Sequence, residues 1–179
     1  MKVIQFVPTL ESGGVEQGVI EISKALVDAG HESHVVSAGG RLVDQLIHEG
    51  TSHHEWKLHK KSILTFRQTN SLAKWIEEMN ADILHVRSRM PAWMVWKALK
   101  KVPENKKPHL VSTIHGLYSV NFYSAVMSKP KNIITVSNSA KSYLLENYKY
   151  TESKNIKLIY RGVDSSEFFP GYKPSNNWL

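Results

Sequence analysis

The sequence predicts an α/β fold: a Rossmann-like, doubly wound parallel sheet with helices on both faces. Apolar runs of strand length recur along the chain, over residues 3–7, 33–37, 83–86, 110–114, 132–136 and 156–160. These runs are apolar throughout rather than at alternate positions, which is typical of strands buried on both faces. Segments with helical period lie between them, as expected for successive β-α-β units.

The first expected strand, 3–7, leads through Pro8 into the glycine pair Gly13-Gly14, and a helix is expected to begin at once. Paired glycines permit positive φ angles and let a ligand approach the main chain without meeting a Cβ atom. The free N–H groups and the dipole of the following helix favour an anion such as phosphate. A tight strand-to-helix connection with no ligand explains the same pattern, so both interpretations stay open.

The other helices are expected from periodicity and from capping residues. The apolar faces of two helices are expected to hold Val19, Ile22, Leu26 and Ala29 in the first, and Leu72, Trp75, Ile76 and Met79 in the second. A helix over 139–148 follows Ser137 and Asn138, which are both good N-cap residues. Trp93 and Trp96 indicate a helix packed on the sheet. A less favoured interpretation, in which they form an edge that contacts lipid or an acceptor, stays open.

Length and composition exclude several classes of protein. A chain of 179 residues fits one domain with a sizeable core. It has no cysteine, which excludes disulfides, thiolate zinc sites and a cysteine nucleophile. The first residues lack the apolar stretch of a signal peptide, and no run approaches the length of a membrane span. We therefore expect a cytoplasmic protein whose membrane contact, if any, is peripheral at the inner face of the membrane.

The formal net charge of +7 is unevenly distributed. Basic residues gather in two clusters, which comprise Lys57, Lys60, Lys61 and Arg67 in the first and Lys97, Lys100, Lys101, Lys106 and Lys107 in the second. Such clusters attract phosphate-rich partners, so an anionic membrane surface and nucleic acid are both candidates. A solvated face without a partner is the third interpretation.

The loops that follow the strands are the expected binding rim, because ligands of open α/β sheets bind beyond the carboxyl ends of the strands. These loops cover 8–14, 38–40, 87–89, 115–118, 137–138 and 161–164. His115 directly follows an apolar strand, where an imidazole can accept a proton or bond a hydroxyl; a bond to a neighbouring carbonyl is the alternative. The run Arg87-Ser88-Arg89 suits a phosphate or carboxylate, with a surface ion pair as the alternative.

Several catalytic and cofactor motifs are missing. The glycines at 13, 14 and 18 do not form a complete G-x-G-x-x-G, so a nicotinamide-dependent oxidoreductase is disfavoured. Neither a Walker A loop nor a G-x-S-x-G nucleophile elbow is present. His54 and His59 are five residues apart and would point about 140° away from each other on a helix. With no D-x-D pair either, we expect chemistry without a metal and without a bound cofactor.

Taken in order, the motifs resemble the N-terminal domain of a retaining glycosyltransferase with the GT-B fold, of the family-four (group one) class. The matching stretches are 13–17, 26–31, 81–88, 112–116, 134–139, 161–164 and 168–170. Each stretch is weak alone, but their order and spacing together identify the family. The resemblance covers residues 1–170, which we expect to form one acceptor-side domain, whereas 171–179 reads as an irregular tail or the start of an interdomain linker.

The resemblance implies roles for individual residues. It places Gly13, Gly14 and Arg161 by the donor phosphates and the cleft, and His115 by the transferred sugar as a catalytic contributor. Many members carry asparagine where this chain has Arg161, which leaves fine specificity open. The acceptor side of the cleft is expected to include Glu16, Arg87, Ser88, Arg89, Gly116, Tyr118, Ser137 and Asn138.

The resemblance also implies a second domain. In this family the nucleotide-sugar is held mainly by a C-terminal domain with two glutamates at E-x7-E spacing, and no two glutamates of this chain stand eight apart. We therefore expect the acceptor-binding part of an enzyme that moves sugar from a UDP- or GDP-sugar to a glycan or lipid-linked acceptor, as in lipopolysaccharide-type biosynthesis. Its missing wall would come from an absent C-terminal domain or a partner chain. The alternative is a non-enzymatic module that binds an anionic membrane surface or, less favoured, nucleic acid.

Overall fold

The computed structural model describes residues 1–58, 63–149, 151–162 and 171. In this part of the chain seven parallel strands form one sheet in the order β3-β2-β1-β4-β5-β6-β7. The strands are β1 Lys2–Phe6, β2 Glu32–Ser37, β3 Ser52–Glu55, β4 Ile83–Val86, β5 His109–Ile114, β6 Asn132–Thr135 and β7 Ile156–Leu158. The predicted doubly wound parallel sheet is confirmed. Residues 172–179 of the predicted tail lie outside the described residues.

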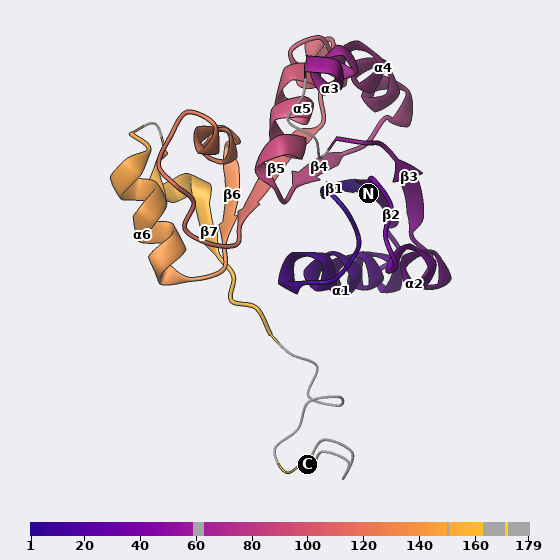
Figure 1. Cartoon of the computed structure of the whole chain (residues 1–179), viewed down its shortest axis with the longest axis horizontal. Helices are drawn as coiled ribbons and strands as arrows, with labels where there is room; N and C mark the ends of the chain where they lie inside the picture. Colours follow the sequence, from indigo (N-terminus) through magenta and orange to yellow (C-terminus); the bar gives the residue numbers. More distant parts are fainter. Residues whose placement is uncertain (59–62, 150, 163–170, 172–179) are drawn as a thin grey trace.

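Helices cover both faces of the sheet. The α-helices are α1 Gly14–Asp28, α2 Val43–His48, α3 Ile63–Arg67, α4 Thr69–Met79, α5 Arg89–Leu99 and α6 Asn138–Asn147. The 3-10 helices are η1 Glu104–Lys106, η2 Ser124–Ser128 and η3 Ser153–Asn155. Figure 1 shows α1 and α2 on one side of the sheet and α3, α4 and α5 on the other. Helix α6 packs beside β6 and β7.

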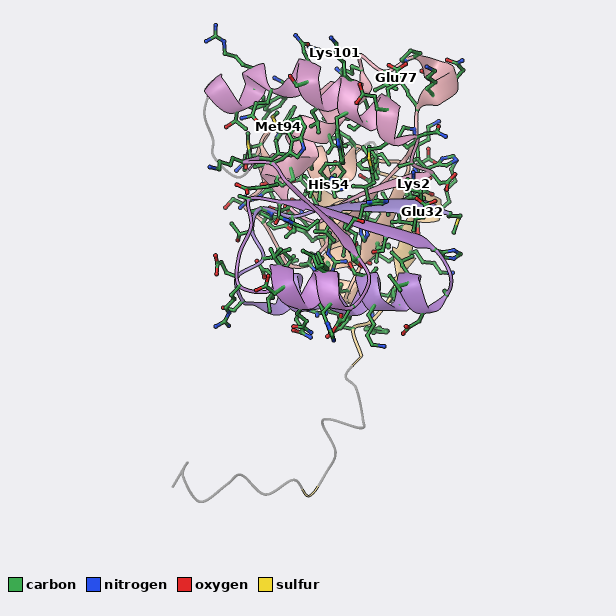
Figure 2. The ribbon with its side chains drawn as sticks, turned by 90° about the vertical axis from the view of Figure 1, so that its right-hand side faces the viewer. Lys2, Glu32, His54, Glu77, Met94 and Lys101 are labelled. Atoms are coloured by element: carbon green, nitrogen blue, oxygen red, sulfur yellow. The ribbon has the colours of Figure 1, made fainter. Side chains whose placement is uncertain are left out.

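Each helical layer buries its own apolar core. The larger core lies between the sheet and helices α4, α5 and α6, with residues of η2 as well, and Met94 is fully buried in it. From the side, Figure 2 shows Met94 inside this layer and Glu77 and Lys101 at its outer surface. The smaller core, beneath α1 and α2, consists of Val7, Leu10, Val19, Ile20, Val35 and Leu46.

The predicted apolar face is correct for α4 and partly wrong for α1. In α4, Leu72 and Ile76 are buried, and Trp75 and Met79 pack against the core. In α1, Val19 is buried, but Ile22 is 37% exposed and Ala29 is exposed. The buried face of α1 instead includes Gly18 and Ser23, because Ser23 bonds a glutamine of the sheet and so turns Ile22 outward.

Strand β3 was not predicted, because its sequence, Ser-His-His-Glu, is polar. It forms the edge of the sheet beside β2, where a strand needs little apolar surface. Its histidines bond the neighbouring strand: His54 Nε2 lies 3.2 Å from His34 Nδ1, and His53 Nε2 lies 2.8 Å from Ser37 Oγ. His59 lies outside the described residues. Among the described residues, no three His, Asp or Glu side chains are placed to hold a metal ion.

The remaining sequence expectations concern tryptophans and membrane spans. Trp93 is 6% exposed in the larger core and Trp96 packs partly against it, as the core interpretation predicts. Among the helices of the described ranges, none combines the length and the apolar character that crossing a bilayer requires.

Candidate functional site

A row of buried polar side chains crosses the face of the sheet beneath α1. Gln5 of β1 pairs in register with His85 of β4, and His85 Nε2 lies 2.7 Å from Thr113 Oγ1 of β5. Side chains two positions apart on a strand share a face, so Arg87 and His115 continue this row at the carboxyl ends of β4 and β5. The order of the strands thus brings together residues far apart in the sequence.

Arg87 is a buried cation that is held by a glutamine. Its side chain is 3% exposed, and Nη1 donates to Gln5 Oε1 at 3.1 Å. Gln5 in turn donates through Nε2 to Ser23 Oγ at 2.8 Å and to the Val19 carbonyl at 3.3 Å. Within the described residues, the buried Nε of Arg87 has no hydrogen-bond partner. Burial and the charge of Arg161 lower the pKa of Arg87 to about 10, so it stays cationic at neutral pH.

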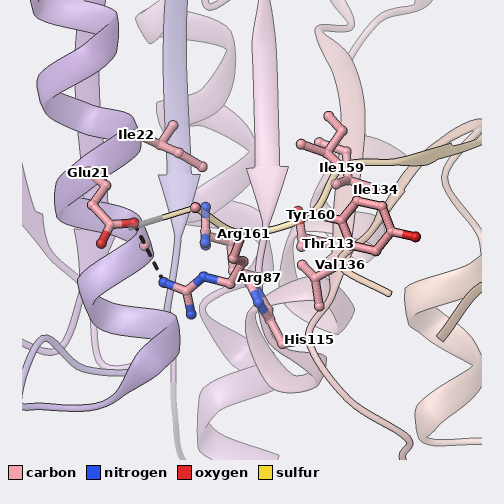
Figure 3. Close-up of a pocket in the computed structure, with 12 residues that line it drawn as sticks. Glu21, Ile22, Arg87, Thr113, His115, Ile134, Val136, Ile159, Tyr160 and Arg161 are labelled. Carbon is pink, nitrogen blue, oxygen red and sulfur yellow. Dashed lines mark ion pairs between the residues drawn. The ribbon is translucent and has the colours of Figure 1, made fainter. Parts of the chain in front are cut away.

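Arg161 reaches back from the end of β7 to α1. Its Nη1 donates to the Gly14 carbonyl, and its Nη2 lies 3.6 Å from Glu21 Oε2. Figure 3 shows this ion pair with the side chain of Arg87 beside it. A Cβ atom on Gly18 would lie 2.8 Å from Arg87 Nη2 and 3.0 Å from Arg161 Nη2. The glycine at position 18 is therefore what lets two guanidinium groups lie against the same helix.

His115 completes the polar side of the site. Its Nε2 is buried and, among the described residues, has no hydrogen-bond partner. Burial lowers the pKa of His115 to about 4, and the charges of Arg87 and Arg161 act in the same direction. At neutral pH the imidazole is thus uncharged and can accept or donate one hydrogen bond at Nε2.

These groups line a pocket of about 210 Å³ between α1 and the segment after β7. Its lining comprises Gly18, Glu21, Ile22, Arg87, Thr113, His115, Ile134, Val136, Ile159, Tyr160, Arg161 and Gly162. Figure 3 shows the guanidinium groups on the side of Glu21, and Ile134, Val136 and Ile159 on the other side, whereas Ile22 lies on the helix near Glu21. Such a pocket can hold an anionic group against one wall and an apolar or sugar-ring surface against the other.

The glycine pair lies next to this pocket. Helix α1 begins at Gly14, and its N-cap, Gly13, has φ 145° and provides no side-chain cap. A Cβ atom on Gly13 would lie 2.7 Å from Glu16 Oε2, so the Glu16 carboxylate lies beside the first turn. The anion interpretation and the plain-turn interpretation of Gly13-Gly14 therefore both remain predictions.

The structure separates two of the predicted arginines. Arg89 does not line the pocket: its guanidinium lies 4.7 Å from the ring centroid of Tyr118 and 5.2 Å from that of Tyr123. Its Nη1 also donates to Ser124 Oγ at 3.3 Å. Ser88 is the N-cap of α5, with no capping bond from its side chain. Arg87 and Arg161, rather than Arg87 and Arg89, form the cationic pair.

Other predicted rim residues have structural partners. Ser137 Oγ accepts a hydrogen bond from the Ala140 amide as the N-cap of α6, and Asn138 Nδ2 donates to the Tyr160 hydroxyl at 2.9 Å. In the loop 38–40, a Cβ atom on Gly40 would lie 2.4 Å from the Leu10 carbonyl carbon, so close packing accounts for this glycine. Gly116 has open space around its Cβ position.

Glu21 and Gln5 are the main site residues that the sequence analysis missed. Glu21 is one of several charged residues on α1, and no motif marked it. Gln5 did carry a signal, because it is the only polar residue in the first apolar run, 3–7. A polar side chain in such a run must find a buried partner, which here is the cationic Arg87.

Comparison with known families settles the class of the chain. A sequence model of Glycosyltransferase Family 4 matches residues 12–167, which include the whole pocket lining. The chain belongs to this family. The resemblance seen in the sequence motifs is therefore confirmed, whereas a comparison with curated proteins gave no match.

Several solved structures share the fold of this family member. A glycosyltransferase from Rickettsia africae ESF-5 matches with a TM-score of 0.80 at 36% identity, over 98% of this chain and 47% of that one. HepE (Alr3699) from Anabaena, in complex with UDP and glucose, gives 0.72 at 16% identity, over 93% and 46%. WaaB, a lipopolysaccharide outer core galactosyltransferase, gives 0.68 at 16% identity, over 91% and 46%. The chain thus spans about half the length of these three proteins.

Proposed function

We propose that this chain is the acceptor-side domain of a retaining glycosyltransferase that transfers a sugar from a UDP- or GDP-sugar to a glycan or lipid-linked acceptor. The observation that carries the proposal is the pocket at the carboxyl ends of β4 and β5, where Arg87 and Arg161 lie beside His115. Membership of Glycosyltransferase Family 4 supports the transfer reaction.

The unpartnered polar atoms of the pocket favour an anionic ligand. Buried donors without partners are costly, and a ligand that bonds the Nε of Arg87 removes that cost. Two neighbouring guanidinium groups suit the diphosphate of a sugar donor, because its negative charge would neutralise their positive charge. Glu21 now pairs with Arg161, so a bound diphosphate would compete with the Glu21 carboxylate for this arginine.

His115 is proposed to act on the transferred sugar as a neutral group. Because its pKa is about 4, the imidazole bonds a sugar hydroxyl without adding a charge. Anion binding nearby would offset the two arginine charges that lower this pKa. The anion and the His115 proton should therefore favour each other, and anion affinity should rise as the pH falls toward the histidine pKa.

The second wall of the cleft is proposed to come from another domain, in the same polypeptide or in a partner chain. The chain spans about half of its structural relatives, and it has no E-x7-E pair for the donor. In this proposal residues 1–170 form the first domain and the segment from 171 leads to the second. The pocket supplies the phosphate-facing and sugar-facing groups, and the other domain supplies most of the nucleotide contacts.

The acceptor is proposed to be an envelope glycan, built at the cytoplasmic face of the membrane. WaaB, which is named a lipopolysaccharide outer core galactosyltransferase and has the same fold, supports an envelope glycan as the acceptor. The acceptor would approach across the rim that includes Glu16, Gly116, Tyr118 and Asn138. Ser88 and Arg89, at the N-terminus of α5, are proposed to belong to the same rim, and like those four residues they are not part of the pocket lining.

Nuclear magnetic resonance of the ¹⁵N-labelled chain tests the pocket directly. Titration with pyrophosphate and with UDP-glucose should give weak binding, with shifts at Gly14, Gly18 and His115. Arg87→Gln should abolish these shifts, whereas Lys24→Gln on the exposed side of α1 should not. Tight binding of the nucleotide-sugar by this chain alone, or shifts that Arg87→Gln leaves unchanged, would contradict the proposed division of the site.

A further inference from the structure

An exposed apolar loop lies just beyond His115. Leu117, Val120 and Phe122, in the connection between β5 and η2, are 63%, 56% and 77% exposed. Three large apolar side chains within six residues are more than the scattered exposure that a water-facing surface normally shows. The loop is not part of the pocket lining, so the proposed transfer site does not account for it.

The loop is held against α5 by an aromatic row. The ring centroids of Phe122 and Trp93 are 5.1 Å apart, and those of Trp93 and Trp96 are 5.5 Å apart. The Trp93 indole also donates from Nε1 to the Tyr123 carbonyl at 2.9 Å. The ring of Phe122 and the backbone of Tyr123 are therefore held against Trp93 of α5, which fixes this end of the loop.

Lysines surround the far end of this row. The Nζ atoms of Lys100 and Lys129 lie 3.7 and 4.6 Å from the ring centroid of Trp96, and Lys97 Nζ lies 4.2 Å from that of Phe66. Within the described residues, none of these three lysines forms an ion pair with a carboxylate.

Their sequence neighbours behave differently. Lys106 pairs with Glu77 and Lys107 with Glu104, and Lys101 bonds Asn70. In this basic cluster Lys97, Lys100 and Lys101 therefore have no carboxylate partner among the described residues, because Asn70 is neutral. Lys100 lies directly beside the aromatic row, where Lys129 adds a second positive charge.

We propose that this surface, formed by Leu117, Val120, Phe122, Trp96, Lys97, Lys100 and Lys129, docks on an anionic lipid bilayer. Apolar side chains that enter the interface, a tryptophan at headgroup level and unpaired lysines facing anionic lipid are the three elements of peripheral membrane binding. Nucleic acid fits less well, because two of the three exposed apolar side chains, Leu117 and Val120, are aliphatic and offer no ring on which a base could stack.

Docking in this orientation would place the pocket near the membrane surface. Leu117 is two residues from His115, so a loop at the interface keeps the end of β5 close to lipid headgroups. The binding itself needs no sugar transfer, and its test is therefore independent of the proposed function.

Flotation of the 179-residue chain with vesicles tests the proposal. The chain should float with vesicles of equal parts phosphatidylcholine and phosphatidylglycerol and much less with phosphatidylcholine alone, and added salt should weaken binding. Replacing Lys97, Lys100 and Lys129 by glutamine should reduce partitioning by about 100-fold, at roughly 1 kcal/mol for each lysine. Replacing Leu117, Val120 and Phe122 by serine should reduce binding even at low salt.

Matched control variants lie on the opposite face of the molecule. Ile47→Ser removes an apolar side chain of α2 that is 54% exposed. The double variant Lys24→Gln, Arg41→Gln, in α1 and just before α2, lowers the net charge by the same amount as the double variant Lys100→Gln, Lys129→Gln. Both controls should float like the parent chain, and thermal unfolding should show that every variant folds. The proposal is overturned if the parent chain does not float, if the controls lose binding equally, or if the chain binds single-stranded RNA and not vesicles.

Discussion

Gln5 and Arg87 are 82 residues apart in the sequence, yet the amide oxygen of Gln5 accepts a hydrogen bond from the buried guanidinium at 3.1 Å. Gln5 is itself fixed by Ser23 of α1, so a single side chain connects the helix, the first strand and the cation. The position of Arg87 in the pocket thus depends on a residue that never reaches the pocket surface.

Replacing Gln5 by leucine should destabilise the fold and disturb the pocket. The substitution leaves a buried guanidinium without its acceptor, which should lower the free energy of unfolding by about 1–3 kcal/mol. Urea unfolding measures this change, and titration with pyrophosphate should show weaker binding.

The double variant Gln5→Leu, Arg87→Leu distinguishes a specific pair from a general packing defect. With no buried charge left, its loss should be smaller than the sum of the two single losses. Strictly additive losses would mean that Gln5 and Arg87 do not act as a pair.

Gly18→Ala is expected to destabilise a helix that alanine normally favours. Intrinsic propensity alone would make alanine better by about 1 kcal/mol. However, the new Cβ would lie 2.8 Å from Nη2 of the buried Arg87, which cannot move away freely. We expect a net loss of about 1–3 kcal/mol in thermal or urea unfolding. Gln17→Ala, an exposed position in the same helix, should change stability little, and a stabilised Gly18→Ala would show that the guanidinium groups are not fixed there.

The strands of the sheet were predictable because their burial on both faces leaves a continuous apolar signal. The polar edge strand β3 carries no such signal, and its pairing through His34, His53 and His54 becomes visible only once β2 lies beside it. The outward turn of Ile22 has the same origin, because it depends on the contact of Ser23 with Gln5. Periodicity describes one element at a time, whereas these features arise from contacts between elements.

The candidate site was predictable only in part for a related reason. The sequence places Arg87, His115 and Arg161 after three of the predicted strands, which are β4, β5 and β7 of the structure, and the rule for parallel sheets gathers them at one edge. It does not say on which face each side chain lies. Arg89 therefore could not be separated from Arg87 before the rings of Tyr118 and Tyr123 were seen around it.

Stability should decrease in mild acid because two histidines are buried uncharged. Burial lowers the pKa of His85 to about 3 and that of His115 to about 4, against an ordinary value of 6.5. Between pH 6.5 and the lowered pKa of each histidine, the unfolded chain binds more protons than the folded chain, so acid favours unfolding. Each histidine contributes a slope of up to about 1.4 kcal/mol per pH unit in that window. Urea unfolding at stepped pH values measures the slope, and stability that stays constant from neutral pH to mild acid would contradict it.

Replacing His85 by glutamine should flatten part of this dependence. Glutamine can still bond Thr113 Oγ1 but takes up no proton in the window, so the slope that remains should come mainly from His115. The half-buried histidines at positions 34, 53 and 54 have lowered pKa values as well, mainly through burial, and add a weaker dependence of the same sign.

Ser137→Ala tests whether a predicted acceptor-side residue has a structural role. Its hydroxyl caps α6 by accepting from the Ala140 amide, so the change should lower stability by about 1 kcal/mol. Ser137→Asp should largely preserve stability, because aspartate is also a good N-cap, and Ser139→Ala inside the helix should have little effect. If Ser137→Ala unfolds like the parent chain, the capping bond contributes nothing measurable.

His115→Ala should remove transfer while leaving the fold intact. The test requires both walls of the cleft, which a chimera provides when this chain replaces the matching half of the Rickettsia africae glycosyltransferase. Because Nε2 of the imidazole has no hydrogen-bond partner among the described residues, we expect its loss to cost the fold little, but it removes a group proposed to bond the transferred sugar. The rate of nucleotide release from UDP- and GDP-sugars should be lower than that of the parent chimera by a factor on the order of 100 or more. If the chimera with His115 is active and the His115→Ala chimera releases nucleotide at the same rate, His115 is excluded from catalysis. His31→Ala, just after the end of α1, serves as the matched control.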